Sequence, residues 1–328
     1  MVSAESLFER FTLALVSLPG IGRKTARAVL QAEKKVPNFP DEFLQVVMRT
    51  AGRRGRKLTI RDADVALQQA DQIIAESSKH DIQIVCISDD QYPFQLREID
   101  DPPVIIFVKG DRSVLMHTDS IAIVGTRHPT DFGKNSARRI GGRLAEEGIA
   151  VVSGLAQGCD TSAHEGCIAS AGRTIAVLAH GLDMVYPKSN AELAERILEQ
   201  GGTLVSEYPI KTEPQRNYYA ERDRIQSALS KVILVIETDL DGGTMHTVRF
   251  AQKQGRQLAC LVHPSEYLDE PSIEGNRMLL RDGLAFPVAD PSDLRDLICR
   301  ARELIQDKTK SGEHHQVEVQ SPLWSDES

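Results

Sequence analysis

The stretch IAIVGTRHPTDFGKNSARRIGGRLAEEGIAVVSGLAQGCDTSAHEGCIASAGRTIAVLAHG, residues 121–181, decides the fold. It contains three short apolar runs, at 121–125, 149–154 and 174–181, and an amphipathic segment of helical period follows each of the first two. Strands that are apolar on both faces and alternate with helices are typical of a parallel sheet covered by helices on both sides. The stretch therefore predicts a doubly wound α/β fold.

The same alternation continues toward the C-terminus. Further helices are predicted at 191–202, 221–230 and 244–255, and further strands at 203–208, 231–238 and 257–262. We therefore predict a mostly parallel, Rossmann-like domain over residues 116–290. Residues 291–328 are expected to form one C-terminal helix, at 293–306, followed by a polar tail without periodicity that we expect to be disordered.

Residues 1–80 have a different pattern, with apolar residues at helical spacing, and we predict a small all-α domain there. Its segment LPGIGRKTA, residues 18–26, has the Pro-Gly-x-Gly pattern of a helix-hairpin-helix. The amides of such a turn can bind phosphates of a DNA backbone, and a purely structural hairpin is the alternative. The secondary backbone contacts predicted at this hairpin are Gly20, Gly22, Arg23 and Lys24.

Between these two parts, residues 81–115 hold two short strand candidates, IQIVCI at 82–87 and VIIFVKG at 104–110. A double proline, Pro102-Pro103, separates them. We expect this segment to connect the helical domain to the Rossmann-like domain.

Charge and composition restrict the function. The 328-residue chain carries a net charge of −8, while residues 1–80 alone hold thirteen basic and nine acidic residues. Because a surface that binds a polyanion must be positive at the contact, local basic clusters such as 53–57 matter more than the total. No apolar run approaches the ~20 residues that span a bilayer, and no secretory signal is recognisable, so we expect a cytoplasmic protein without a membrane partner.

The five cysteines and the absent catalytic motifs argue for binding rather than catalysis. No cysteine pair has C-x-x-C spacing, which predicts neither a zinc site nor a disulfide framework. The chain has no G-x-S-x-G, H-E-x-x-H or P-loop motif. Asp160 and His164 have a spacing that could serve a metal, but a local hydrogen bond is the more ordinary explanation. We therefore predict no metal and no catalytic residue.

The loops that follow the predicted strands are the candidate binding site, because ligands of doubly wound sheets bind at the carboxyl ends of the strands. Glycine amides and hydroxyls at helix starts favour an anion such as a phosphate, although glycine-rich turns also simply allow tight connections. The first loop lacks the glycines of G-x-G-x-x-G at 127 and 130, so no dinucleotide cofactor is expected. The candidates in these loops are Gly125, Thr126, Arg127, Ser153, Gly154, Lys188, Gly243 and Thr244.

Arginines and tyrosines are most densely mixed at 216–224, where Arg222 and Arg224 follow Tyr219. Guanidinium groups pair with phosphates and aromatic faces stack on bases, which is the combination that binds a single strand. Acidic residues interleave, so an ion-paired helix start is the alternative.

The order of these motifs resembles the DprA/Smf family of DNA-processing proteins, from about Tyr92 to Pro287. The segments that carry the resemblance are YPFQLREIDDPPVIIFVKGD (92–111), IAIVGTRHPTDFG (121–133), VVSGLAQGCDTSAHEG (151–166), TIAVLAHGLDMVYPKSN (174–190), GTLVSEYP (202–209), residues 219–230, VIETDLDGGTMHTVRFAQKQGR (235–256) and EGNRMLLRDG (274–283).

The resemblance implies a non-catalytic homodimer without a cofactor. Such a protein binds single-stranded DNA and promotes loading of a RecA-type recombinase, as in natural transformation and recombination. By position, it places DNA contacts at the loop residues above other than Lys188, at Tyr219, Arg222 and Arg224, and at Thr247. The chain departs from the family pattern at Ala220, Asp223 and Gly242, where the family has Pro, Asn and Ser.

Two other functions stay open on the sequence. A Rossmann-like protein could instead bind or cleave a small nucleotide, including as a component of a defence system, with Glu237 as the candidate acid. The net acidity and the departures from the family pattern are also compatible with a scaffold in a multi-protein assembly.

Overall fold

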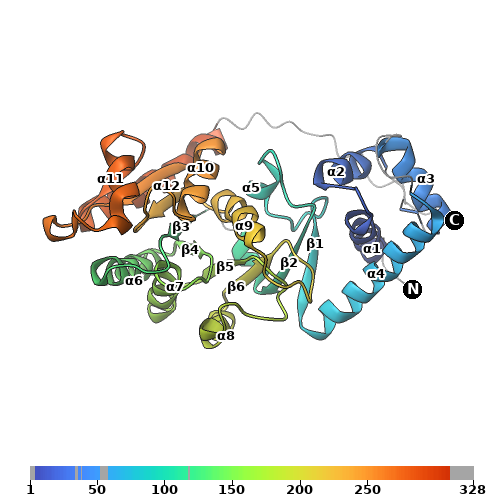
Figure 1. The fold of residues 1–328 in the computed structure, drawn as a ribbon, viewed down its shortest axis with the longest axis horizontal. Helices are drawn as coiled ribbons and strands as arrows, with labels where there is room; N and C mark the ends of the chain where they lie inside the picture. The colour runs from blue at the N-terminus through green and yellow to red at the C-terminus, as the bar shows by residue number, and fades with distance from the viewer. Residues whose placement is uncertain (1–3, 34–35, 38, 52–57, 117–118, 311–328) are drawn as a thin grey trace.

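The structure is a computed structural model that describes residues 4–33, 36–37, 39–51, 58–116 and 119–310 (Figure 1). The basic cluster at 53–57 and the polar tail from 311 onward lie outside these residues. Helices of the N-terminal part lie at one end of the molecule, and α11 (Glu274–Arg281) lies at the other end (Figure 1).

The N-terminal part is helical, as predicted. Its helices are α1 (Ala4–Ser17), α2 (Arg23–Ala32), α3 (Pro40–Ala51) and α4 (Ile60–Lys79). The predicted hairpin joins α1 to α2: Gly20 has φ +79°, and the amide of Ile21 donates to the carbonyl of Leu18 at 3.2 Å. Glycine adopts such a positive φ without steric cost, which explains its place in this turn.

The remainder of the described chain is built on one nine-stranded sheet. Its strand order is β1-β2-β6-β5-β4-β3-β7-β8-β9, and the strands from β6 to β9 in this order are parallel. The strands are β1 (Ile82–Cys86), β2 (Ile105–Gly110), β3 (Ser120–Val124), β4 (Ala150–Ser153), β5 (Thr174–Leu178), β6 (Thr203–Ser206), β7 (Val232–Val235), β8 (Gln257–Leu261) and β9 (Phe286–Val288). The doubly wound, mostly parallel fold is confirmed.

Residues 81–115, interpreted from sequence as a connecting segment, supply two strands of this sheet. β1 pairs with β2 and β2 pairs with β6, both in antiparallel register, with Phe107 opposite Ser206. The segment also contains the short helix α5 (Phe94–Arg97) and the 3₁₀ helix η1 (Arg112–Met116). The sheet therefore extends toward the N-terminal helices through this antiparallel edge.

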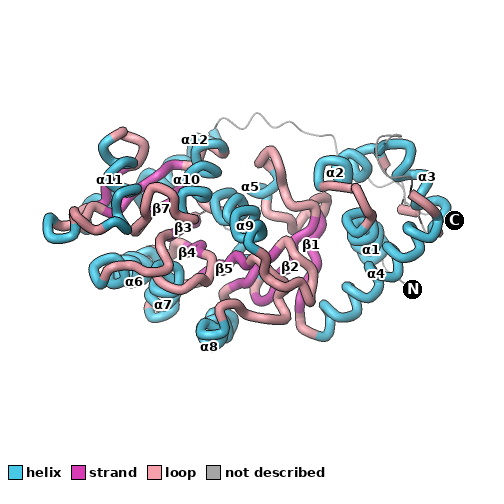
Figure 2. Tube along the Cα trace, viewed as in Figure 1, coloured by secondary structure: helices cyan, strands magenta, loops and turns pink. Residues whose placement is uncertain are grey.

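Helices cover both faces of the sheet (Figure 2). Ile121 and Ile123 of β3 pack in a cluster with α6 (Asp131–Glu146), α7 (Cys159–Ala169) and α12 (Pro291–Lys310). Ala122 and Val124 point to the other face, toward α9 (Arg216–Ala228), α10 (Thr244–Lys253) and α11. Such alternation along an entirely buried strand explains why the sequence shows continuous apolar runs.

The N-terminal helices share a core with the sheet. Phe11 and Leu18 of the helical part belong to the same buried cluster as Phe107 of β2 and Ile197 of α8 (Ala191–Glu199). The remaining short 3₁₀ helices are η2 (Lys188–Asn190), η3 (Ser265–Tyr267) and η4 (Pro271–Ile273). The helical part is therefore packed against the sheet rather than attached only by a linker.

Candidate functional site

The strand order reverses between β3 and β7, because β4 lies on one side of β3 and β7 on the other. Such a switch point opens a crevice at the carboxyl ends of the two strands. A pocket of about 340 Å³ lies there, and we call it the switch-point pocket. The predicted contact residues that line it are Gly125, Thr126, Arg127, Tyr219, Arg222, Gly243, Thr244 and Thr247.

The mouth of the switch-point pocket carries a basic and an aromatic side chain, beside one exposed acid, Asp239. Arg127 is exposed, and its guanidinium lies 5.2 Å from the centre of the Tyr219 ring, within the range of a cation–π contact. Within the described part of the chain, no carboxylate forms an ion pair with Arg127. Its charge is therefore available to a ligand.

The start of α10 places a helix N-terminus at the mouth. Gly243 and Thr244 line the pocket at the first residues of this helix. The first amides of a helix have no intrahelical acceptor, and the helix dipole adds positive potential there. The sequence prediction that this glycine-rich turn opens a helix at the pocket edge is confirmed.

The floor of the pocket contains two carboxylates and one guanidinium. Nε of Arg222 lies 3.2 Å from Oδ1 of Asp223, and its Nη1 donates to the carbonyl of Val177 at 2.6 Å. Asp160 accepts from the amides of Gly154 and Ala156 at 3.1 and 3.4 Å. Arg222 is therefore largely satisfied by the protein itself.

Burial raises the pKa of both floor acids. It raises the pKa of Asp160 against the opposing charge of Arg222. Burial also raises the pKa of Asp223 to about 7, with Asp160 adding to the shift and Arg222 opposing it. The sequence identified Asp223 only as a departure from the family pattern and did not predict that it would meet Asp160 across the floor.

Four of the predicted contact residues lie outside the lining of this pocket. Two of them support it from behind: Ser153 is buried, and its hydroxyl donates to the carbonyl of Ile123 at 2.7 Å. A Cβ on Gly154 would collide with the guanidinium of Arg222, so glycine is what allows Arg222 to lie there. Lys188 is exposed in η2, in the loop that follows β5.

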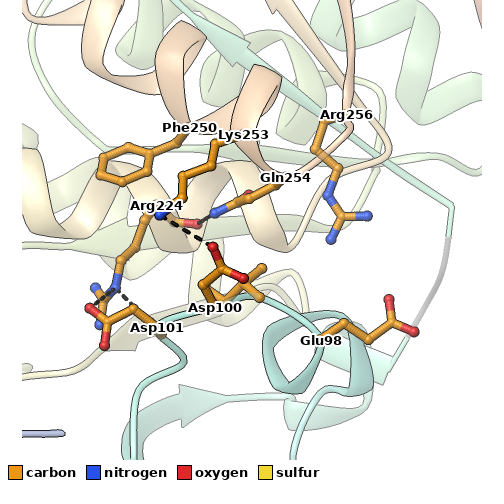
Figure 3. Close-up of a pocket in the computed structure, with 9 residues that line it drawn as sticks. Glu98, Asp100, Asp101, Arg224, Phe250, Lys253, Gln254 and Arg256 are labelled. Carbon is orange, nitrogen blue, oxygen red and sulfur yellow. Dashed lines mark hydrogen bonds and ion pairs between the residues drawn. The ribbon is translucent and has the colours of Figure 1, made fainter. Parts of the chain in front are cut away.

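Arg224, the fourth, points to a different part of the molecule. Its Nη2 pairs with Glu207 at 2.7 Å, and its Nε donates to the carbonyl of Asp101 at 3.0 Å. It lines a second pocket, of about 380 Å³, where it extends toward Asp101 while Lys253 reaches Asp100 (Figure 3). Residues two apart on a helix project in nearly opposite directions, so Arg222 and Arg224 do not form one contact surface.

Arg23 of the helix-hairpin-helix also forms ion pairs within the protein. Arg23 pairs with Asp101 at 2.8 Å, with Glu221 at 2.9 Å and with Glu207 at 3.6 Å. It therefore faces the sheet, which leaves Gly20, Gly22 and Lys24 as the exposed residues of the predicted backbone contact.

Glu237, the candidate acid of a nucleotide-cleaving protein, is fully buried. Its carboxylate accepts from the amide and hydroxyl of Thr130, at 2.8 and 2.5 Å, and lies 3.1 Å from Nε2 of His263. Burial would raise its pKa, but the hydrogen bonds from His263 and Thr130 lower it overall. Glu237 therefore fastens the start of α6 to the end of β7.

Two further features concern metals and membranes. The described residues include no group of three or more His, Cys, Asp or Glu side chains that could hold a metal ion. None of the described helices is both long enough and apolar enough to cross a membrane.

The fold and this pocket define a doubly wound α/β protein with a crevice at its switch point that is lined by an exposed arginine and by a helix N-terminus. The chain belongs to the DNA recombination-mediator protein A family, whose model matches residues 83–298. The resemblance to DprA/Smf proteins is thereby confirmed.

Curated relatives agree with this assignment. The chain is 36% identical over 212 residues to the DNA processing protein DprA of Bacillus subtilis, a match that covers 65% of this chain and 70% of that protein. It is 38% identical over 203 residues to Protein Smf of Escherichia coli, covering 62% of this chain and 53% of the relative. The match thus spans about half the length of the Escherichia coli protein.

Solved structures show the same fold. DprA from Streptococcus pneumoniae matches with a TM-score of 0.72 and 27% identity, over 90% of this chain and 98% of that one. DNA processing protein A from Helicobacter pylori matches with a TM-score of 0.59 and 29% identity, over 69% of this chain and 96% of that one. The Helicobacter pylori structure addresses a single-stranded DNA binding mode of that protein.

Proposed function

We propose that this protein binds single-stranded DNA at the switch-point pocket. The observation that carries the proposal is Arg127, an exposed guanidinium without an acidic partner in the described chain, placed over Tyr219 at the mouth of the pocket. The single-stranded DNA binding mode of the Helicobacter pylori relative supports the same ligand.

The geometry suits a single strand better than a duplex. A phosphate beside Arg127 and the first amides of α10 would place the adjoining nucleotide at the pocket, next to Tyr219. Stacking on an aromatic side chain requires an unstacked base, which a single strand presents at little cost, and contributes about 1–3 kcal/mol per base. A net charge of −8 limits attraction to DNA elsewhere on the surface.

The proposal extends to partners and location. We infer that the protein acts as a non-catalytic homodimer in the cytoplasm and promotes loading of a RecA-type recombinase onto the bound strand. The family description, a recombination mediator, supports such a partner. The carboxylate of Glu237 is buried and accepts hydrogen bonds from Thr130 at the start of α6, which argues against the nucleotide-cleaving alternative.

The test compares wild type with Arg127→Ala by fluorescence anisotropy, using a labelled oligothymidine and a duplex of equal length over a range of salt concentrations. Loss of the Arg127 charge and its contact with Tyr219 should weaken oligothymidine binding by more than about tenfold. Wild-type affinity should fall as salt rises, with a shallower slope for Arg127→Ala because one phosphate contact is lost.

Arg173→Ala provides the matched control. Arg173 is an exposed arginine just before β5, at the end of the strands opposite the pocket, so its removal changes the net charge equally without touching the pocket. We expect this variant to stay within about twofold of wild type. Unchanged affinity in Arg127→Ala would reject the pocket as the binding site.

A further inference from the structure

The floor of the switch-point pocket contains two acids, whereas its mouth carries Arg127 and the N-terminus of α10 beside the exposed Asp239. When Asp160 and Asp223 are ionised, two carboxylates face one guanidinium, that of Arg222, whose donors already contact Asp223 and the carbonyl of Val177. A phosphate pushed to the floor would meet net repulsion, because like charges at such distances in a partly buried site repel strongly. The phosphate therefore belongs at the mouth, and a different part of the nucleotide must occupy the floor.

One carboxylate oxygen of Asp223, Oδ2, is available to accept a hydrogen bond from a ligand. Its Oδ1 is engaged by Arg222 and, in the side-chain orientation that satisfies both neighbours, by the amide nitrogen of Gln226 at 3.0 Å. No described residue donates a hydrogen bond to its Oδ2. The side chain is 11% exposed, and Asp223 lines the pocket. Because Asp223 lines the pocket, this oxygen can accept a hydrogen bond from a donor on the ligand.

Nucleobases differ in the donors that they present to such an acceptor. An ionised carboxylate only accepts hydrogen bonds. Cytosine and adenine carry exocyclic amino groups with two N–H bonds, whereas thymine has a single ring N–H between two carbonyl oxygens that the carboxylate repels. A pocket of about 340 Å³ falls within the size range of small-molecule sites, and the Tyr219 ring at its edge provides a face for stacking.

We propose that Asp223 determines base preference by accepting a hydrogen bond from the amino group of a nucleobase seated in the switch-point pocket, while the phosphate stays at the mouth beside Arg127. The inference rests on the proposed function, since it concerns the strand bound at that same site. It assigns a purpose to the carboxylate that stands where the resemblance to the DprA/Smf family leads one to expect asparagine.

The experiment measures competition by unlabelled oligodeoxycytidine, oligodeoxyadenosine and oligothymidine of equal length at pH 8, with the full chain. Wild type should bind the two amino-bearing strands at least about fivefold more tightly than oligothymidine. Asp223→Asn should reduce this preference to less than about twofold or reverse it, because the asparagine amide also donates to the thymine carbonyls. If Asp223→Asn does not fold, Asp223→Ser is measured in the same way and should show the same loss of preference.

Glu213→Gln is the matched control, because Glu213 is an exposed acid just before α9 and the substitution changes the net charge equally. This variant should keep the wild-type preference. The inference is overturned if Asp223→Asn keeps the wild-type preference. It is also overturned if Asp223→Asn binds all three strands more tightly by the same factor, because Asp223 would then only repel the DNA backbone. Binding to none of the strands would instead contradict the proposed function itself, whereas tight binding without base preference overturns this inference alone.

Discussion

A buried carboxylate links stability to pH, and Asp223 is the clearest case in this protein. Burial raises its pKa to about 7, above the roughly 3.9 of an unfolded aspartate. Between these values the folded state holds a proton that the unfolded state has lost, so this group destabilises the fold increasingly as pH rises from about 4 to about 7. Asp223→Asn should therefore raise the free energy of unfolding by about 2–4 kcal/mol at pH 8, the upper value being the full pKa shift with nothing subtracted for the lost pairing with Arg222, and by little at pH 4, as measured by urea denaturation. An equal effect at both pH values would contradict the assignment.

Sequence reasoning located many of the residues that line the switch-point pocket but could not determine the direction of each side chain. Glycine, hydroxyl and arginine residues after β3 and before α10 were predicted, because loop position and residue type suffice to find them. The separation of Arg222 from Arg224 depends on how α9 is rotated over the sheet. Asp160 of α7 and Asp223 of α9 come from opposite faces of the sheet and approach each other where both line the pocket, and no local sequence pattern encodes this approach.

At the scale of elements, the N-terminus of α6 shows what holds the loop of Arg127 in place. Thr130 caps this helix, accepting from the amide of Gly133 at 3.0 Å while its own hydroxyl donates to Glu237. Thr130→Ala should lower the free energy of unfolding by about 1–2 kcal/mol, because it loses the cap and leaves Glu237 one donor short. Thr130→Ser keeps the hydroxyl and should recover most of that loss in the same denaturation measurement. Equal stabilities of the two variants would show that the hydroxyl is unimportant.

The elements found from sequence are those with a strong period. The amphipathic segment that follows the apolar run at 121–125 becomes helical at Asp131, a boundary that the Thr130 cap and its distant partner Glu237 set together. α11 and β9 were not predicted, because eight and three residues are too short for a periodic signal. The pairing of β2 with β6 joins residues about a hundred positions apart, which a local pattern cannot reveal.

At the scale of the whole molecule, a charged cluster and a shared core join the helical part to the sheet. Arg23 of α2 pairs with Asp101, Glu207 and Glu221 across this boundary, and Arg224 of α9 joins the cluster from the sheet side through Asp101 and Glu207. Burial would raise the pKa of Asp101, but its hydrogen bonds with Arg23 lower it overall. This contribution to stability is therefore present above the unfolded pKa of about 3.9 and is lost only as pH falls through the lower folded value.

Arg23→Ala should loosen α2 without abolishing single-stranded DNA binding at the switch-point pocket. The variant leaves Glu221 with fewer cationic partners but keeps the pairing of Arg224 with Glu207 and the apolar core that includes Leu18. Because Arg23 is only partly buried, we expect a cost of about 1 kcal/mol, seen as roughly fivefold faster hydrogen exchange of the α2 amides. Lys24→Ala, which changes an exposed neighbour, should leave that exchange unchanged. Equal exchange in the two variants would mean that the apolar core alone holds α2 to the sheet. A large loss of oligothymidine affinity in Arg23→Ala would mean instead that the hairpin arginine leaves its acidic partners to contact DNA.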